Sequence, residues 1–257
     1  MIAYRCQASG GQKDLSASYT VTTVHNNVES KWPSSCYELF SNDQTFNRNV
    51  IIGNNVAIGD RMFWNCRALN TNIYIPDSIK SCRYMFWGCV NLNQNIRIPN
   101  NADVRGMFMR CNSLNQNIQI PEGQTNLVSL FSACPNLNQQ IKIPESAINI
   151  REMFLGCSSL NQDMIIPENV MDCSGVFTNC IDMHKNIYFK GKNYRNIRIN
   201  NLISSQINAL MSINIYFNHA LNNIFNTLWG SWTSWTPMEN GFYNETWHVN
   251  CYYNYPG

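Results

Sequence analysis

Cysteine is the residue type in this chain with the widest capacity for chemistry. The eleven cysteines could serve as disulfides, thiolate nucleophiles or metal ligands. Six of them recur at intervals of 22 or 23 residues: Cys66, Cys89, Cys111, Cys134, Cys157 and Cys180. Metal ligands must converge on one point, which an evenly spaced row does not do, and the chain has no C-x-x-C pair. We therefore predict no metal site.

The six thiols are better explained as buried structural groups. A buried thiol behaves as a small hydrophobic side chain, and its weak S–H can donate to a backbone carbonyl of a turn. Disulfides between neighbouring repeats are a geometrical alternative, although the number of cysteines is odd. Cys36, Cys82 and Cys173 fit the structural interpretation, whereas Cys6 and Cys251 lie outside the repeat and have no assigned role.

Signatures of catalysis are missing from the sequence. The four histidines stand in unrelated contexts, and no H-E-x-x-H, G-x-S-x-G or phosphate-binding loop occurs. Asp163 and Glu168 share one repeat, but a single pair of carboxylates there is typical of a solvated surface. Asn244-Glu245-Thr246 matches the glycosylation sequon, which has no meaning without an export signal. We predict a non-enzymatic protein with no catalytic residues and no cofactor.

The elements that position these residues belong to a repeat of about 23 residues. Each copy is anchored by one phenylalanine, and the anchors are Phe40, Phe63, Phe86, Phe108, Phe131, Phe154 and Phe177. An apolar residue precedes each anchor, cysteine follows it by three in six copies, and an apolar residue follows it by six. A period in the low twenties is typical of a leucine-rich-repeat-type solenoid. We predict about seven coils over residues 36–190.

Two segments of each copy suggest its secondary structure. The I-x-I segment has the period of a β-strand, and a following proline, which has no N–H to donate, ends the ladder. The M-F-x-x-C-x-x-L segment has apolar spacings of three and four, which indicate one or two turns of α- or 3-10 helix. Stacked coils would pair their strands in parallel and share one core.

The pattern M-F-x-x-C-x-x-L followed by I-x-I-P resembles the BspA-like leucine-rich repeats. The M-F pair is also similar to the related repeat of mycoplasma surface lipoproteins. The resemblance covers residues 36–190 and implies a solenoid fold, with adhesion or another interaction at a cell surface as its expected use. The form L-N-Q-N-I-x-I-P departs from the commoner pattern by one extra residue before the strand.

Polar residues at fixed places offer two candidate surfaces. The asparagines seven residues after six of the seven anchors are expected to brace the turns as an internal ladder, with a ligand-binding row as the alternative. The outward face of the predicted sheet varies between copies and is the candidate binding surface for protein or glycan, with an ordinary solvated face as the alternative. Its proposed contact residues are Tyr74, Arg97, Gln119, Lys142 and Tyr188.

Both ends of a solenoid need caps. Residues 1–35 contain a β-type run at 16–24 and are predicted to be an N-terminal β cap or attachment segment. Residues 191–257 are predicted to form degenerate coils and a mixed cap, with strands at 196–199 and 213–217, helices at 202–211 and 220–228, and a hairpin turning at 239–241. The aromatic tail is either part of this cap or a contact surface, through Trp229, Trp232, Trp235 and Trp247.

Composition narrows the classes of function. The net charge of +2 is too small to indicate binding of nucleic acid. No run of eighteen apolar residues and no signal peptide is evident, so neither membrane insertion nor export is predicted. Free thiols, many asparagines and no export signal favour a bacteriophage virion structural protein, such as a tail or baseplate adhesin or a capsid-attached fibre, assembled in the reducing host cytoplasm. Its partners would be other virion proteins, a host surface protein or glycan, or further copies of the chain. The alternative is a bacterial or protist cell-surface protein of the BspA-like kind.

Overall fold

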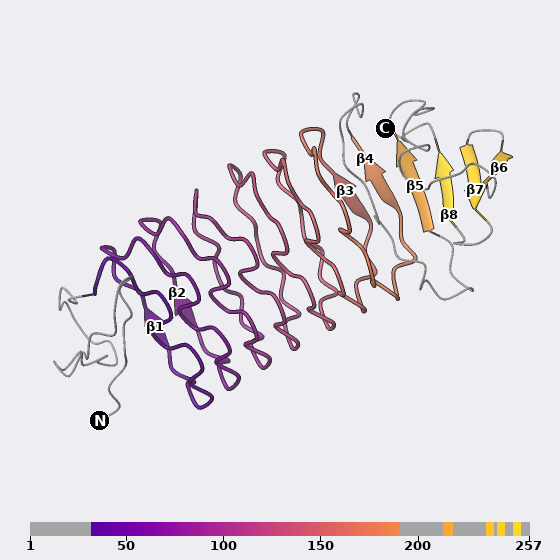
Figure 1. Ribbon diagram of the computed structural model, residues 1–257. Helices are drawn as coiled ribbons and strands as arrows, with labels where there is room; N and C mark the ends of the chain where they lie inside the picture. Colours follow the sequence, from indigo (N-terminus) through magenta and orange to yellow (C-terminus); the bar gives the residue numbers. More distant parts are fainter. Residues whose placement is uncertain (1–31, 191–212, 218–234, 239–240, 245–248, 253–257) are drawn as a thin grey trace.

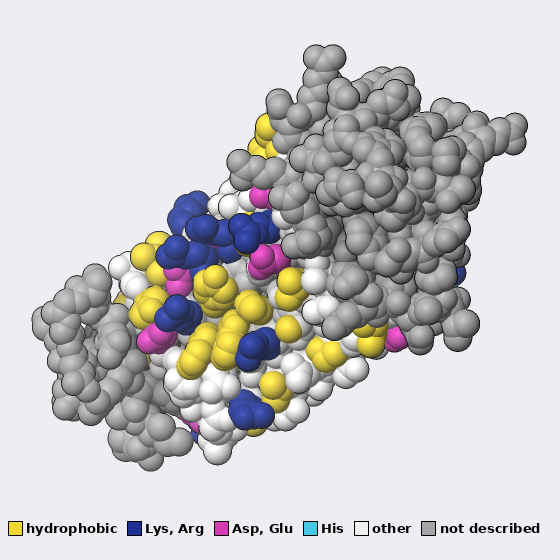
Figure 2. All heavy atoms as spheres, turned by 45° about the vertical axis from the view of Figure 1, so that its right-hand side comes forward, with side chains coloured by type: hydrophobic (Ala, Val, Ile, Leu, Met, Phe, Trp, Pro, Cys, Tyr) yellow, Lys and Arg dark blue, Asp and Glu magenta, His cyan; other side chains and the backbone are white. Residues whose placement is uncertain are grey.

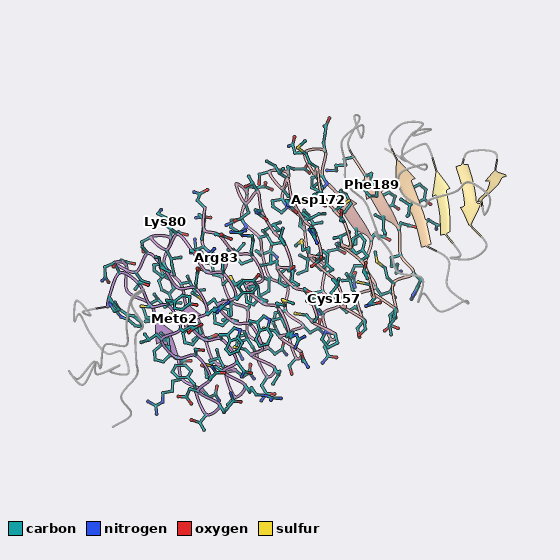
Figure 3. All side chains as sticks on the ribbon, viewed as in Figure 1. Met62, Lys80, Arg83, Cys157, Asp172 and Phe189 are labelled. Atoms are coloured by element: carbon teal, nitrogen blue, oxygen red, sulfur yellow. The ribbon has the colours of Figure 1, made fainter. Side chains whose placement is uncertain are left out.

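The chain forms an elongated stack of coils (Figure 1). The computed structural model describes residues 32–190, 213–217, 235–238, 241–244 and 249–252. Its core is one continuous cluster that runs from Cys36 to Ile215 and contains the repeated Phe, Met, Leu, Ile and Cys positions. Figure 3 shows the side chains along this stack, among them the fully buried Met62, Cys157 and Phe189. The leucine-rich-repeat type of fold predicted from the sequence is therefore present.

The anchor phenylalanines form the spine of the core. Each ring lies almost parallel to the next, with interplanar angles of 6–13° and centroids 5.2 Å apart for Phe40 and Phe63, rising to 6.0 Å for Phe154 and Phe177. Aromatic rings at this separation attract one another beyond the burial of their area. Because all the anchors are fully buried, the spine fixes the register of each coil on its neighbours.

Parallel strands occur at both ends of the stack but not in its middle. The strands are β1 (Val50–Ile51), β2 (Ile73–Tyr74), β3 (Met164–Ile166), β4 (Ile187–Phe189), β5 (Ile213–Phe217), β6 (Trp235–Met238), β7 (Gly241–Asn244) and β8 (Val249–Tyr252). β1 pairs with β2 in parallel, and β3 pairs with β4 in the same way. The segments at 96–98, 118–120 and 141–143, predicted to be strands, carry none.

A local hydrogen bond explains two of these interruptions. The N–H of Ile96 donates to the carbonyl of Gln94 at 2.9 Å, and the N–H of Ile118 donates to that of Gln116 at the same distance. Such a bond over two residues closes a tight turn and removes the N–H from any ladder. The apolar side chains of Ile96 and Ile118 are nevertheless buried as predicted.

The C-terminal strands continue the solenoid sheet. The order is β3-β4-β5-β8-β7-β6, with β5 and β8 parallel to the strands before them and β7 and β6 added in antiparallel fashion. β5 and the β6–β7 hairpin confirm the strand and the hairpin predicted for this region. A parallel edge that continued unpaired would invite another chain, and the antiparallel hairpin covers that edge.

The helical turns predicted for the M-F-x-x-C-x-x-L segment of each copy are wrong, because no helix occurs in the described residues. The M-F-x-x-C segment is instead a series of turns. In the coil of Phe63, alternate N–H groups bond inside the coil, as from Met62 to the carbonyl of Gly59 at 3.1 Å, or to the next coil, as from Phe63 to that of Met85 at 2.9 Å. Turns with an N–H bonded three residues back place apolar groups at the same spacings as a helix, which is why the sequence pattern misled.

Positive φ angles make a helix impossible here. The residues two before and two after every anchor have φ between 53° and 74°, the left-handed region that ends an α-helix. Asn65 and Gly88 are of types that tolerate this conformation, whereas Arg61 and Glu152 adopt it at a cost. The lateral hydrogen bonds between coils hold these residues in place.

Other predictions fall outside the described residues. These are the N-terminal cap, the strand at 196–199, the helices at 202–211 and 220–228, Cys6, Trp229, Trp232 and Trp247. Trp235 and Cys251 lie in β6 and β8, where the backbone alone is described. The boundaries at residues 35 and 190, and the number of coils, stay predictions. No helix able to cross a lipid bilayer occurs in the part of the chain described.

Candidate binding site

The repeated thiols form a ladder through the core. Each Sγ donates to the carbonyl of the anchor phenylalanine one coil earlier, over 2.9–3.2 Å, from Cys66 on Phe40 to Cys180 on Phe154. Burial raises the pKa of Cys66 and of Cys157 to about 12. The thiols therefore stay protonated, and the eight cysteines from Cys66 to Cys180 are all free. A buried, protonated thiol is neither a nucleophile nor a metal ligand.

The asparagines seven residues after the anchor form a second ladder between successive coils. The side-chain oxygen of Asn70 accepts the backbone N–H of Asn93 at 2.9 Å, and four further pairs along the stack repeat this contact at 2.9–3.0 Å. The glutamine that follows donates to the same oxygen, as from Gln94 to Asn70 at 3.1 Å. These amides bond to one another, which is the internal bracing predicted from the sequence.

The row predicted on the outward sheet face is exposed apart from the half-buried Tyr188, and most of its members contact residues of their own chain. Tyr74 is 52% exposed, Arg97 forms a 2.7 Å ion pair with Asp77, and Gln119 donates to its own neighbour Asn117. Hydrogen bonding from Arg97 lowers the pKa of Asp77.

The remaining two members of this row also have partners within the chain. Lys142 lies 3.5 Å from Glu122, and Tyr188 stacks on Tyr216 with centroids 4.9 Å apart. The row therefore has its contacts largely satisfied from within, and its use for binding stays a prediction.

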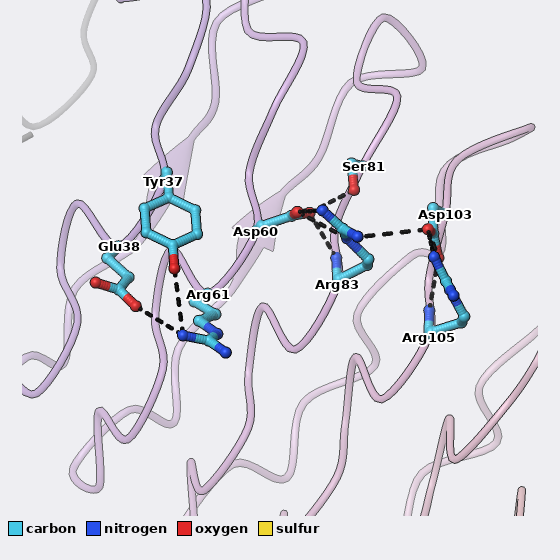
Figure 4. Close-up of polar contacts among 8 residues, drawn as sticks. All are labelled: Tyr37, Glu38, Asp60, Arg61, Ser81, Arg83, Asp103 and Arg105. Carbon is cyan, nitrogen blue, oxygen red and sulfur yellow. Dashed lines mark hydrogen bonds and ion pairs between the residues drawn. The ribbon is translucent and has the colours of Figure 1, made fainter. Parts of the chain in front are cut away.

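Arginines that precede the anchors are paired with carboxylates (Figure 4). Arg61 donates to Glu38 at 3.1 Å and to the Tyr37 hydroxyl at 3.2 Å. Arg105 grips Asp103 through two nitrogens, at 2.9 and 2.6 Å. Partial burial acts to raise the pKa of Asp103, but these hydrogen bonds outweigh it and lower that pKa.

Asp60 is the most enclosed of these carboxylates, at 4% exposure. It accepts the Ser81 hydroxyl, the backbone N–H of Arg83 at 2.9 Å and the Arg83 Nε at 2.8 Å. All three donors come from the next coil, so Asp60 clamps two coils together. Arg61, Arg83 and Arg105, called here the paired arginines, are thus occupied in holding the stack.

Residues that follow the anchors border a hollow of about 460 Å³ that is largely open to solvent. It is lined by Arg67, Trp87, Gly88, Val90, Arg110, Asn112, Ala133, Pro135 and Gly156. Trp87 stacks on Trp64 of the preceding coil, with centroids 4.8 Å apart, and the Arg110 guanidinium lies 5.2 Å from the Trp87 ring centroid. Figure 2 shows a face of the molecule where hydrophobic side chains gather next to Lys and Arg. A volume of this size suits a ligand of moderate size.

The small lining residues are a consequence of the turn geometry. Gly88, Ala133 and Gly156 occupy the position two after the anchor, where φ is 73°, 57° and 74°. Glycine meets this demand without strain, and its missing side chain leaves space above the coil. The corresponding positions in other copies carry larger residues, such as Asn65 and Arg110. The hollow is therefore a local feature of the middle coils.

Sequence reasoning missed this hollow. Two signals could have indicated it: Asn or Gly stands two residues after the anchor in five of the seven copies, and Trp64 and Trp87 occupy the same repeat position. The first predicts a positive φ and the second an aromatic stack between coils. In the described part of the chain, no group of three or more His, Cys, Asp or Glu residues is placed to hold a metal.

Comparisons with known proteins agree with the repeat fold. The sequence model described as BspA type Leucine rich repeat region matches in six copies, over residues 34–161 and 94–203. A search of curated proteins finds no match.

Solved structures add two similarities. One is a leucine-rich repeat protein from Bacteroides ovatus ATCC 8483, with 24% identity and a TM-score of 0.55, covering 71% of this chain and 52% of that one. The other is a leucine rich cell surface protein from Faecalibacterium prausnitzii A2-165, with 17% identity, a TM-score of 0.29 and coverage of 62% and 54%. The first supports the fold, and the second is too dissimilar to carry an argument. The chain spans about half the length of each.

Proposed function

Because the chain belongs to the BspA-type leucine-rich repeat family, we propose that it is a non-enzymatic interaction protein of a cell surface. Its partner is a surface protein or glycan, bound on the solenoid without chemical change. The observation that supports binding is the hollow, where Trp87 and Arg110 present an aromatic ring and an arginine together. Aromatic and arginine side chains contribute most to recognition surfaces.

The virion hypothesis from the sequence receives no support from the comparisons. The matching family and the solved structure of similar fold contain nothing that points to a phage particle. The cell-surface alternative agrees with the family resemblance, so we prefer it. Further copies of the chain remain an additional candidate partner.

Location is tested on intact cells of the source organism. An antibody against the solenoid should label unpermeabilised cells, and external protease should remove that label. An abundant cytoplasmic protein, which must stay unlabelled and intact, serves as the control. Label seen only after permeabilisation, or recovery of the chain in purified phage particles, would reject the surface assignment.

Binding is tested with the purified full chain on immobilised surface glycans and extracellular proteins. We expect saturable binding to at least one of them, with the ligand recovered unaltered. A ligand that is cleaved or modified by the chain would reject the non-enzymatic assignment.

A further inference from the structure

We propose that the hollow binds an acidic oligosaccharide, whose carboxylate or sulfate groups are held by Arg67 and Arg110. This inference rests on the proposed function and narrows its ligand to one chemical class. Neither arginine belongs to the sheet face that the sequence favoured.

The first argument is charge. Of the eight arginines in the described residues, Arg61, Arg83, Arg97, Arg105 and Arg151 form ion pairs with carboxylates. Arg48, Arg67 and Arg110 form none within the part of the chain described, and two of these three line the hollow. No Asp or Glu lines it with them. Two uncompensated guanidinium groups at one concave place favour an anion.

The second argument is the position of Arg110. Its guanidinium lies 5.2 Å from the centroid of Trp87, and that ring is backed by Trp64 at 4.8 Å. A cation over an aromatic ring is attracted to it, so the stack orients the arginine. The in-plane N–H groups of a stacked guanidinium stay available for bidentate bonds to a carboxylate or sulfate.

The third argument separates a sugar from a peptide. Peptides that bind beside repeats or sheets often pair with unused backbone groups. Most of these N–H groups around the hollow are used, as in Gly88, Arg110 and Gly156, which donate to carbonyls of the next coil at 2.9, 2.8 and 2.7 Å. Recognition therefore rests mainly on side chains: two guanidinium groups, the exposed amide of Asn112 and apolar walls. Acidic sugars carry the matching groups, namely anions, hydroxyls and apolar ring faces.

The test measures binding of defined oligosaccharides to the full chain by calorimetry. The probes are a sulfated heparin hexasaccharide, an oligogalacturonate of similar length and a neutral cello-oligosaccharide. We expect one or both acidic probes to bind and the neutral probe not to bind, with affinity falling as salt rises. The sulfated and carboxylated probes distinguish the two anionic groups.

Matched variants assign that binding to the hollow. Arg110→Met and Arg67→Met should each weaken it about tenfold, the value of one lost charge-assisted contact. Asn112→Asp, which adds a negative charge of nearly the same shape, should weaken it as well. Arg48→Met, which removes an unpaired arginine elsewhere, should leave it unchanged. Thermal unfolding checks that all four variants are folded.

Three results would overturn the inference. They are an equal loss of affinity for the acidic probes in Arg48→Met and Arg110→Met, no binding of either acidic probe, and tighter binding of a Glu-rich decapeptide than of the acidic probes. None of these affects the proposed function if the chain still labels at the cell surface and binds a protein there. Conversely, acidic sugar binding by a chain found only inside cells would support the hollow and reject the surface assignment.

Discussion

The coils of Phe63 and Phe108 carry arginines on both sides of the anchor phenylalanine, and the arginines on the two sides differ in their partners. Before the anchor, Arg61, Arg83 and Arg105 each meet a carboxylate within 3.1 Å. After the anchor, Arg67 and Arg110 meet none within the described residues and border the hollow. The difference shows that a repeated backbone can use one residue type for cohesion on one edge and leave it available on another.

The placement of acids in the repeat produces this difference. Carboxylates occur two or three residues before the anchor, as Glu38 and Asp60 do, so that an arginine one repeat later lies beside them. At the positions one, two and four after the anchor, no copy carries Asp or Glu. Stacking places equivalent positions next to each other, so an edge without acids cannot neutralise its own arginines.

The largest expected effect tests whether the residues after the anchor, which border the hollow, are as firmly packed as those before it, which carry the paired arginines. Cys82 precedes the anchor Phe86 by four residues, and Cys89 follows it by three. Burial raises the pKa of both thiols. In the folded protein at pH 8, we expect both to be alkylated at least about a thousandfold more slowly than in denaturant, since exposure requires unfolding. Peptide mass spectrometry over time gives the rate at each residue. Fast labelling of Cys89 alone would show that the hollow side opens by itself.

The ladder thiols Cys66 and Cys157 set the alkaline limit of the fold. Their folded pKa is raised, so the stability that they contribute is complete below the unfolded value of about 8.5 and is lost as the pH rises toward about 12, the folded value of Cys66 and Cys157. Far-ultraviolet circular dichroism should therefore show unfolding within that interval. A fold unchanged at pH 12 would contradict the buried ladder.

A smaller effect is expected when the same substitution, arginine to methionine, is made before and after the anchor and the losses of unfolding free energy are compared. Arg83→Met leaves the buried Asp60 without its guanidinium and should cost about 3 kcal/mol of unfolding free energy. Arg110→Met loses only its contact with Trp87 and should cost under about 1 kcal/mol. Urea unfolding measures both, with Arg48→Met as the surface control. Equal losses of unfolding free energy in the two variants would mean that Arg83 and Arg110 stabilise the fold to the same extent.

The smallest effect is the change in unfolding free energy at acid pH that comes from the ion pair of Asp103 with Arg105. Asp103→Asn should cost about 0.5–1 kcal/mol at pH 7, because Asp103 and Arg105 are partly exposed. The folded pKa of Asp103 is lowered, so its contribution is present above about pH 3.9 and disappears as the pH falls through the folded value. The stability gap between variant and parent should therefore narrow as the pH falls below about 3.9. A gap that does not change with pH would assign the loss to packing.

Prediction from the sequence succeeded where the period alone decides the contact. The burial of Phe86 and Cys89 and the contact between Asn70 and Asn93 follow from placing equal positions side by side. Prediction failed for the segment around Met85 and Phe86, because apolar spacings of three and four suit both a helix and a row of turns. Only the φ of Tyr84 and Gly88, set by bonds to the next coil, distinguishes them.

The sequence by itself determined that this chain is a solenoid with a phenylalanine spine, a thiol ladder and an asparagine ladder. A 23-residue period places equivalent side chains of successive coils next to one another. The tertiary structure decided which arginines are neutralised and where a hollow opens. Those outcomes depend on the direction in which each turn points its side chains and on the coil that supplies the partner. The left-handed turns on either side of the anchor set both, and hydrogen bonds between coils, rather than local preference, hold those turns.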